Sequence, residues 1–452
     1  MIKYFIPLIL ILFIGCNESN KNKPTYFGGK IINPKCDFVV LSDNYNFNDT
    51  IPLSKNNTFL GSYDKFKEGL YIFHHGNELQ YVYMQPSDSL LIRLNTWDFD
   101  ESLVFSGVNA ERNNLLIESF LQYEQDYKNS SKYLSLPKKE FLAKIDSMKS
   151  IKNATLESYK TRSNDASGFV DILNISLNFP LYAKLEEYAI QSLKKETSEK
   201  INNSYFDYRK SAPINKDSLM FYGPYYKFII KKIQNDAYLK DNGVKTEKFT
   251  QNLLQAIDEN VKLETVKNKM LYNAVIRNFY EEPSSEMKSE AFFTFFKLNT
   301  NNEHKKNVQR LINDLKILNK GERLPSFKLI AADGELKDFS SISKNKNTVV
   351  LLKNYQYASD DWVSSRFNYL VKKNPDVNFV LVNLCDSSKR FTKNVDVKYQ
   401  YTIPSESAVC NFTTSKFPRM ILVDKYGIIQ NGYTSLSAND INLEISKLQK
   451  TK

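Results

Sequence analysis

Cysteines are the residues of this chain with the most distinctive chemistry, and there are four: Cys16, Cys36, Cys385 and Cys410. Thiol–disulfide exchange needs a thiolate that attacks a sulfur and a second thiol that resolves the mixed disulfide. No two cysteines here have the Cys-x-x-Cys spacing that usually supplies such a pair. Four cysteines in 452 residues also exclude a fold held together mainly by disulfides.

Cys16 follows what we interpret as an export signal. A short basic start, residues 1–3, precedes an uncharged apolar stretch over residues 4–14 and then Gly15. The stretch has about half of the roughly 20 residues needed to cross a bilayer. A small residue directly before a cysteine resembles the lipobox of bacterial lipoproteins, where the signal is cut before the cysteine and the cysteine carries the lipid. The alternative is a simple signal peptide with an incidental Cys16.

Composition points to an exported globular protein. Hydrophobic residues make up 42% of the chain, enough for two or three domain cores. The formal net charge is +11, but the lysines are scattered along the chain and form no basic block. We read this charge as a solvated surface and expect no nucleic-acid partner. No second apolar run approaches membrane-spanning length, so the expected membrane contact is the lipid on Cys16.

Two regions of different periodicity follow the signal. Short alternating segments separated by turn residues predict an antiparallel, sandwich-like β domain. These segments are residues 27–32, 38–41, 50–53, 69–73, 80–84 and 89–94. From residue 109 to about 320, apolar residues recur at helical spacing, and prolines such as Pro137 and Pro180 mark most of the expected helix boundaries.

The C-terminal third alternates strands and helices. An apolar run at residues 348–352 predicts a buried strand, and Ser359 or Asp360 can cap the helix that follows it. Residues 377–382 predict a second buried strand. Pro418 then leads into residues 420–423, a turn, and a closing helix. This order predicts an α/β fold.

The segment from about residue 321 resembles the TlpA/ResA-type thiol–disulfide oxidoreductases of the thioredoxin superfamily. The resemblance rests on Leu-Pro-Ser-Phe at 324–327, the strand at 349–352, and Phe417-Pro418 before 420–424. The whole chain is similar to TlpA-family lipoproteins of Bacteroidetes and Flavobacteria. It would then be a multidomain α+β protein with an N-terminal antiparallel β domain, a central all-α domain and a C-terminal α/β thioredoxin-like fold. The expected boundaries are 1–16 for the signal, 17–25 for a tether, 26–108, 109–320 and 321–452.

The resemblance also implies where an active site would lie. In the family's register, Ala358 and Asp361 occupy the two cysteine positions, and Pro418 stands where the family has a cis-proline. A cis X–Pro bond costs only about 0.5–1 kcal/mol, so Pro418 can be expected to adopt it. Alanine and aspartate cannot exchange disulfides, so the family's redox activity does not carry over through this motif.

Two functions remain open from the sequence. In the first, Tyr357, Trp362 and Phe417 form a binding surface for a peptide or protein, and the molecule is a non-catalytic lipoprotein of the cell envelope. In the second, Cys385 and Cys410 form a displaced redox pair; a structural disulfide between them or two unpaired thiols are the other readings. We expect neither a metal nor a cofactor. The expected location is periplasm-facing, lipid-anchored at the outer membrane.

The lipid anchor can be tested directly. Replacing Cys16 with Ala removes the acceptor for acyl chains, each of which contributes about 0.8 kcal/mol of membrane affinity per buried methylene. We therefore expect the Cys16→Ala protein to leave the membrane fraction in fractionated cells. Continued dependence of that variant on detergent would show that another segment anchors the chain.

Overall fold

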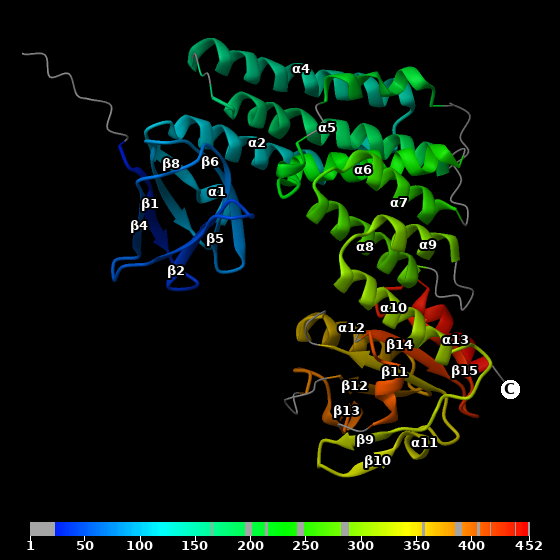
Figure 1. Ribbon diagram of the computed structural model, residues 1–452. Coiled ribbons are helices and arrows are strands. Elements are labelled where there is room, and N and C mark those ends of the chain that lie inside the picture. Colours follow the sequence, from blue (N-terminus) through cyan, green and yellow to red (C-terminus); the bar gives the residue numbers. More distant parts are fainter. Residues whose placement is uncertain are drawn as a thin grey trace, which may run out of the picture. The chain divides into compact units, whose positions relative to one another are not determined.

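The computed structural model describes most of the chain (Figure 1). Outside the described residues lie 1–22, 164, 166, 195–200, 213–215, 242–247, 282–288, 355–357, 385–390, 405–406, 416, 439 and 451–452. The chain forms two compact units. Unit 1 comprises Met1–Ala189, Ile201–Ala212 and Leu219–Lys231, and unit 2 comprises Ile190–Lys200, Pro213–Ser218 and Lys232–Lys452. No helix among the described residues is long and apolar enough to cross a membrane.

Unit 1 begins with two four-stranded sheets, ordered β4-β1-β7-β8 and β3-β2-β5-β6. The strands are β1 Thr25–Ile32, β2 Phe38–Ser42, β3 Asn48–Pro52, β4 Thr58–Tyr63, β5 Gly69–His75, β6 Glu78–Met84, β7 Ser89–Asn95 and β8 Val104–Gly107. Side chains of β2, β4 and β7 alternate between buried and more exposed positions, whereas β5 buries four residues in a row. Both sheets share one core, which includes Phe27, Phe73 and Val82. The alternation in β2, β4 and β7 is the period of two expected for strands with one buried face.

The pairing of the first sheet differs from the predicted antiparallel arrangement. β1 pairs antiparallel with β4 but parallel with β7, with Phe27 opposite Leu90. The intervening β2, β3, β5 and β6 belong to the other sheet, so the chain returns to the first sheet in the same direction as β1. The strands β4 and β8 were not predicted from the sequence, because β4 exposes Leu60 and β8 is only four residues long.

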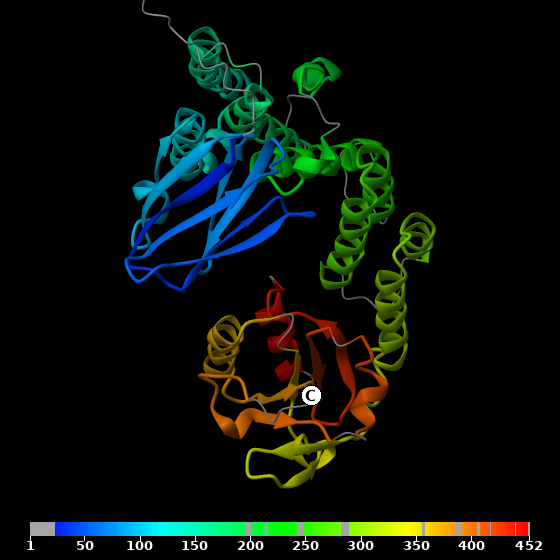
Figure 2. The same cartoon turned by 60° about the vertical axis from the view of Figure 1, so that its left-hand side comes forward.

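Helices of unit 1 pack against these sheets and against one another (Figure 2). They are α1 Phe99–Ser102, α2 Ala110–Lys128, α3 Ser130–Leu134, α4 Lys138–Ser163, α5 Phe169–Lys194, the 3-10 helices η1 Asn203–Ser211 and η2 Asp217–Leu219, and α6 Gly223–Lys240; α5, η2 and α6 each cross the unit boundary. The sequence placed a helix boundary at Pro180, but α5 continues through it. Its apolar neighbours Phe179 and Leu181 are buried, and tertiary packing of this kind outweighs the loss of one helical hydrogen bond.

Unit 2 combines a short run of helices with one large sheet (Figure 1). The helices are α7 Phe249–Asn260, α8 Glu264–Glu281, α9 Ser289–Leu298, α10 Asn302–Ile317, α11 Phe339–Ile342, α12 Asp360–Lys373 and α13 Ile441–Lys450, with 3-10 helices η3 Val397–Tyr399 and η4 Ala408–Asn411. The strands are β9 Lys328–Ala331, β10 Leu336–Asp338, β11 Thr348–Lys353, β12 Asn378–Asn383, β13 Gln400–Thr402, β14 Arg419–Val423 and β15 Ile429–Thr434.

The sheet of unit 2 has the order β10-β9-β13-β12-β11-β14-β15. β11 pairs parallel with β12 and antiparallel with β14, which in turn pairs antiparallel with β15. α12 and α13 cover one face, where Phe367 and Ile445 join the core with Val349 and Leu351. The opposite face buries Val350 and Leu352 with Phe327 and other residues. The arrangement β11-α12-β12, then β14-β15-α13, is the thioredoxin-like order predicted for this part of the chain.

Candidate binding cleft

A cleft lies where the thioredoxin-like resemblance places an active site. Its volume is ≈ 570 Å³, and its walls come from the start of α12, the start of β14, and α8. The structure brings Ala358, Trp362, Phe417 and Pro418 together in this cleft, as predicted. Asp361 is exposed in the first turn of α12 and is not among the lining residues.

The N-terminus of α12 sets the position of Trp362. Ser359 is the N-cap residue, and its hydroxyl accepts a hydrogen bond from the Trp362 backbone N–H at 3.4 Å. This satisfies one of the backbone donors that a helix leaves unpaired at its first turn. The Trp362 side chain lines the cleft and remains 46% exposed. Trp362 is therefore available for contact with another molecule.

Phe417 and Pro418 differ in two ways from the sequence expectation. Phe417 is only 4% exposed, so it forms a buried wall and not an open contact surface. Its ring lies 6.3 Å from the ring of Tyr272 on α8. No peptide bond among the described residues is cis, so the Phe417–Pro418 bond is trans and not cis as the resemblance implied. The two isomers of an X–Pro bond differ by only about 0.5–1 kcal/mol, too little for sequence alone to decide.

Helix α8 forms a wall that the sequence did not predict. Tyr272, Asn273, Ile276 and Arg277 of this helix line the cleft opposite Trp362 and Pro418. The expected open groove is therefore a cleft between the thioredoxin-like fold and a helix of the same unit. No signal in the sequence links α8 to residues more than 100 positions later.

The segment before β14 is held by a fully buried ion pair between Asp314 and Arg419. Arg419 Nη1 donates to Asp314 Oδ2 at 3.2 Å, and both side chains are 0% exposed. Asp314 also accepts four hydrogen bonds from the backbone N–H groups and hydroxyls of Thr414 and Ser415, at 2.6 to 3.0 Å. A buried carboxylate requires this many donors to offset its lost hydration. The pair thus fixes Phe417 and Pro418 relative to α10.

Sequence reasoning missed this pair, although a signal for it exists. Leu311, Asp314 and Leu318 recur at spacings of three and four on α10, so Asp314 falls on the apolar face of the helix. Arg419 likewise opens a strand that is otherwise apolar. A charged residue on each of two buried surfaces indicates that the two charges meet.

A second ion pair lies at the end of β11. Lys353 is 3% exposed; its ammonium donates to Asp360 and, at 3.0 Å, to the hydroxyl of Thr392. Lys353 also lines the cleft, directly before the segment that would hold the catalytic cysteines of an oxidoreductase. The described lining of the cleft contains no thiol.

The remaining predicted site residues divide into two groups. Cys410 is exposed in η4. Cys16, Tyr357 and Cys385 lie outside the described residues. The lipidation of Cys16, the contribution of Tyr357 to the binding surface and a disulfide between Cys385 and Cys410 therefore stay predictions.

Cys36 lies next to a histidine in unit 1, but the pair lacks the geometry of a catalytic dyad. Cys36 Sγ is 3.6 Å from His75 Nδ1 and 3.3 Å from the carbonyl oxygen of Phe38. His75 Nδ1 lies 3.0 Å from the same carbonyl, while Nε2 accepts the Lys35 backbone N–H at 2.9 Å. These partners assign the proton to Nδ1, so this nitrogen donates to the carbonyl and cannot accept a proton from Cys36.

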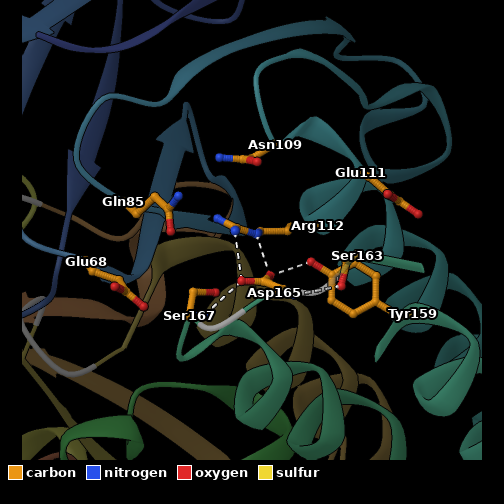
Figure 3. Close-up of a pocket in the computed structure, with 9 residues that line it drawn as sticks. All are labelled: Glu68, Gln85, Asn109, Glu111, Arg112, Tyr159, Ser163, Asp165 and Ser167. Atoms are coloured by element: carbon orange, nitrogen blue, oxygen red, sulfur yellow. Dashed lines mark hydrogen bonds and ion pairs between the residues drawn. The ribbon is translucent and has the colours of Figure 1, made fainter. Parts of the chain in front are cut away.

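A polar pocket in unit 1 surrounds another buried ion pair (Figure 3). Arg112 donates through Nε and Nη2 to the two carboxylate oxygens of Asp165, at 2.9 and 3.0 Å. Tyr159 donates to Asp165 at 2.5 Å, and the Ser167 backbone N–H donates at 2.9 Å. Glu68 and Glu111 also line this pocket, so its charge does not favour an anion. We assign it the structural role of joining α2 to the connection between α4 and α5.

The comparisons with known proteins found likenesses among solved structures, and those described below have low identity and low TM-scores. No known family matches the sequence, and no curated protein matches it. A protein from Bacteroides vulgatus assigned as a thiol-disulfide oxidoreductase is 23% identical, with a TM-score of 0.26, over 29% of this chain and 97% of its own. The thioredoxin domain of another B. vulgatus thiol-disulfide oxidoreductase is 19% identical, with a TM-score of 0.23, over 30% of this chain and 99% of its own. A thioredoxin-like protein from Bacteroides caccae is 11% identical, with a TM-score of 0.28, over 59% of this chain and 94% of its own.

The Arg112–Asp165 pair predicts acid-dependent stability. Burial raises the pKa of Asp165, but hydrogen bonds from Ser167 and Tyr159 and the charge of Arg112 outweigh it and hold that pKa below the ordinary 3.8. A lowered folded-state pKa adds stability that is present above the unfolded-state pKa and is lost as pH falls through the folded-state pKa. We expect Asp165→Asn to lower the free energy of unfolding by about 3 kcal/mol at pH 7, in urea titrations.

The difference between Asp165→Asn and the unmodified chain should shrink below about pH 4. Glu157→Gln is the matched control, because Glu157 forms an exposed pair with Lys160 on α4 and should change stability by less than about 0.5 kcal/mol. A pH-independent difference for Asp165→Asn would contradict the assigned role of the carboxylate charge.

Proposed function

We propose that this protein is a lipid-anchored protein of the cell envelope whose thioredoxin-like domain binds an extended apolar polypeptide segment without exchanging disulfides. The observation that carries the proposal is the half-exposed Trp362 in a cleft that has Ala358 in place of a thiol. The exposed part of the Trp362 indole at the edge of the cleft costs free energy in water unless a partner covers it.

The chemistry of the cleft suits a peptide. Its apolar walls include Ile276, Leu351, Val363 and Leu436, which favour aliphatic or aromatic side chains of a ligand. Ser435 and Ser437 also line it, and their hydroxyls lie 2.9 Å apart. Hydroxyl groups can both donate to and accept from the backbone of a bound peptide. A volume of ≈ 570 Å³ fits one or two large side chains with their backbone.

The retained fold makes binding without catalysis chemically consistent. Redox enzymes of this class use the helix N-terminus to lower the pKa of a thiolate. Here the first turn of α12 carries Asp360 and Asp361, whose charges the helix dipole stabilises without any thiol chemistry. The alternative, a divergent oxidoreductase acting through Cys385 and Cys410, is the second candidate, because β12 ends at Asn383, two residues before Cys385 in the sequence.

Trp362 offers a direct assay, because the chain has only two tryptophans. In a Trp97→Phe chain, emission from Trp362 alone should shift to the blue when a synthetic peptide of alternating leucine and serine binds. Loss of an aromatic anchor typically costs about 2 kcal/mol or more, which is roughly thirtyfold in affinity. We therefore expect Trp362→Ala to weaken peptide binding about thirtyfold in calorimetric titrations.

Trp97→Ala is the matched control, since Trp97 is 73% exposed and does not line the cleft. Its affinity for the peptide should equal that of the unmodified chain. Equal losses in the two variants, or no binding to the unmodified chain, would overturn the peptide proposal.

The absence of redox chemistry has its own test. We expect the full chain, purified in a non-ionic detergent, not to accelerate the reduction of insulin by dithiothreitol, because Ala358 and Asp361 stand at the thiol positions. Turnover that disappears in the double variant Cys385→Ser, Cys410→Ser would establish the alternative function. Turnover that persists in it would contradict both readings.

A further inference from the structure

Unit 1 contains a cavity of ≈ 730 Å³ that the proposed function does not use. It lies between the β5–β6 hairpin, α2, α5 and the start of α6. Most of its walls are apolar or aromatic; these residues are Leu116, Phe120, Tyr123, Pro180, Tyr222 and Pro224. Pockets that bind small organic molecules have this size and this predominance of apolar walls.

The cavity has a buried end and an open end. Leu116, Ser119 and Tyr222 are at most 5% exposed, whereas Leu79 and Tyr127 are 43% and 64% exposed. The Ser176 hydroxyl donates a hydrogen bond to Ser119 Oγ at 2.8 Å across the interface of α2 and α5. A small molecule can therefore enter from solvent and place part of itself among buried groups.

Lys184 is the feature of this cavity that points to a ligand. Its side chain lines the cavity and is 4% exposed. Its ammonium donates to Ser130 Oγ at 2.9 Å and to the backbone oxygen of Asp126 at 3.5 Å, which are both uncharged groups. Within the described part of the chain no carboxylate forms an ion pair with Lys184. The carboxylate of Asp126 instead pairs with Lys152 Nζ at 3.5 Å.

Of the other charged residues that line the cavity, Glu78 is exposed to solvent, and the rest have partners. Lys231 pairs with Glu187 at 3.4 Å, and Lys227 donates to the Tyr123 hydroxyl at 2.8 Å. Asp100 accepts a hydrogen bond from Gln80 at 2.8 Å. Burial lowers the pKa of Lys184 and outweighs the charges of Asp126 and Glu187, which raise it. This is expected for an ammonium that has lost water without gaining a counter-ion. A buried ammonium of this kind is costly unless an anion neutralises it.

We propose that this cavity binds a small amphipathic carboxylate, with the carboxylate on Lys184 Nζ and the apolar body against the aromatic walls. The ammonium has three hydrogens, and its two described acceptors leave one for the ligand. The buried location makes the ion pair strong, because little water competes for either charge. The apolar walls then select carboxylates with a hydrocarbon or aromatic body over small ones such as acetate.

The rival reading is that Lys184 only ties α5 to the end of α2 and to α3 through Asp126 and Ser130. A comparison of three probes separates the two readings: naphthoate, the neutral naphthylmethanol and the cationic naphthylmethylamine. Each is titrated calorimetrically into the full chain in a non-ionic detergent. We expect naphthoate to bind at least tenfold more tightly than either of the others, as a charged hydrogen bond to a buried group implies.

Three variants complete the test. Lys184→Met should weaken naphthoate at least tenfold and leave naphthylmethanol unchanged, since methionine keeps much of the length of lysine but not its charge. Lys160→Met is the control, because Lys160 is an exposed lysine of the same unit that pairs with Glu157 and does not line the cavity, and it should change naphthoate affinity less than twofold. Ala183→Trp, which fills the cavity, should abolish binding of both probes.

Circular dichroism of each variant reports whether it folds. If Lys184→Met does not fold, the titrations of Ala183→Trp decide between the two readings. Three results would overturn the proposal: no naphthoate binding to the unmodified chain, equal affinity for naphthoate and naphthylmethanol, or naphthoate binding that survives both Lys184→Met and Ala183→Trp.

Discussion

The buried pair of Asp314 and Arg419 is the constraint on which the candidate cleft depends. Two charges without solvent exposure lie 3.2 Å apart between α10 and the start of β14. Dehydration of such a pair costs several kcal/mol per ion, and only close geometry with further hydrogen bonds offsets it. Because Thr414, Ser415 and Arg419 all donate to the one carboxylate, the chain on either side of Pro418 has little freedom. The cleft is rigid on this side for an electrostatic reason, not because of proline alone.

This constraint also explains why the thioredoxin-like fold and the helices before it belong to one unit. α10 is anchored to β14 by charge, while α8 contributes apolar contacts, with Phe279 on α8 lying 5.9 Å from Tyr433 on β15. A single buried ion pair broken on one side costs about 3–5 kcal/mol, a large share of the stability of a typical domain. The helix that forms the second wall of the cleft is therefore held in place by interactions that the cleft residues themselves do not make. A ligand in this cleft meets a surface built from two parts of the chain, and α8 sets the width available to it.

The sequence predicted local features well and long-range features poorly. The cap at Ser359 and the strands at 348–352 and 377–382 follow from turn chemistry and periodicity. The placement of Trp362 and Pro418 in one cleft was implied by the family resemblance and not by the residues alone. The parallel pairing of β1 with β7 does not, because register between distant strands is decided by packing of the two sheets and not by either segment. The same holds for the wall formed by α8 and for the cavity around Lys184, where the relevant residues are spread over four elements. Buried charges were the missed signal: Asp314, Arg419 and Lys184 each stand within an apolar stretch.

Ala358 and Asp361, which stand at the two cysteine positions of the family that the C-terminal segment resembles, suit their surroundings without thiol chemistry. Ala358 packs, half-buried, against the core beneath α12, so a small apolar side chain suits that environment as well as a thiol would. Asp361 lies in the first turn of the same helix, where backbone N–H groups and the helix dipole favour negative charge. The helix N-terminus also stabilises a reactive thiolate. A thiol, however, needs a neighbouring group to lower its pKa before it is ionised at neutral pH, whereas an aspartate is ionised without one. On the proposed function, Asp361 serves as the negative charge at the helix N-terminus, and the apolar walls of the cleft are available to a bound segment. This local fit is the structural basis of the proposal that the cleft binds a ligand without exchanging disulfides.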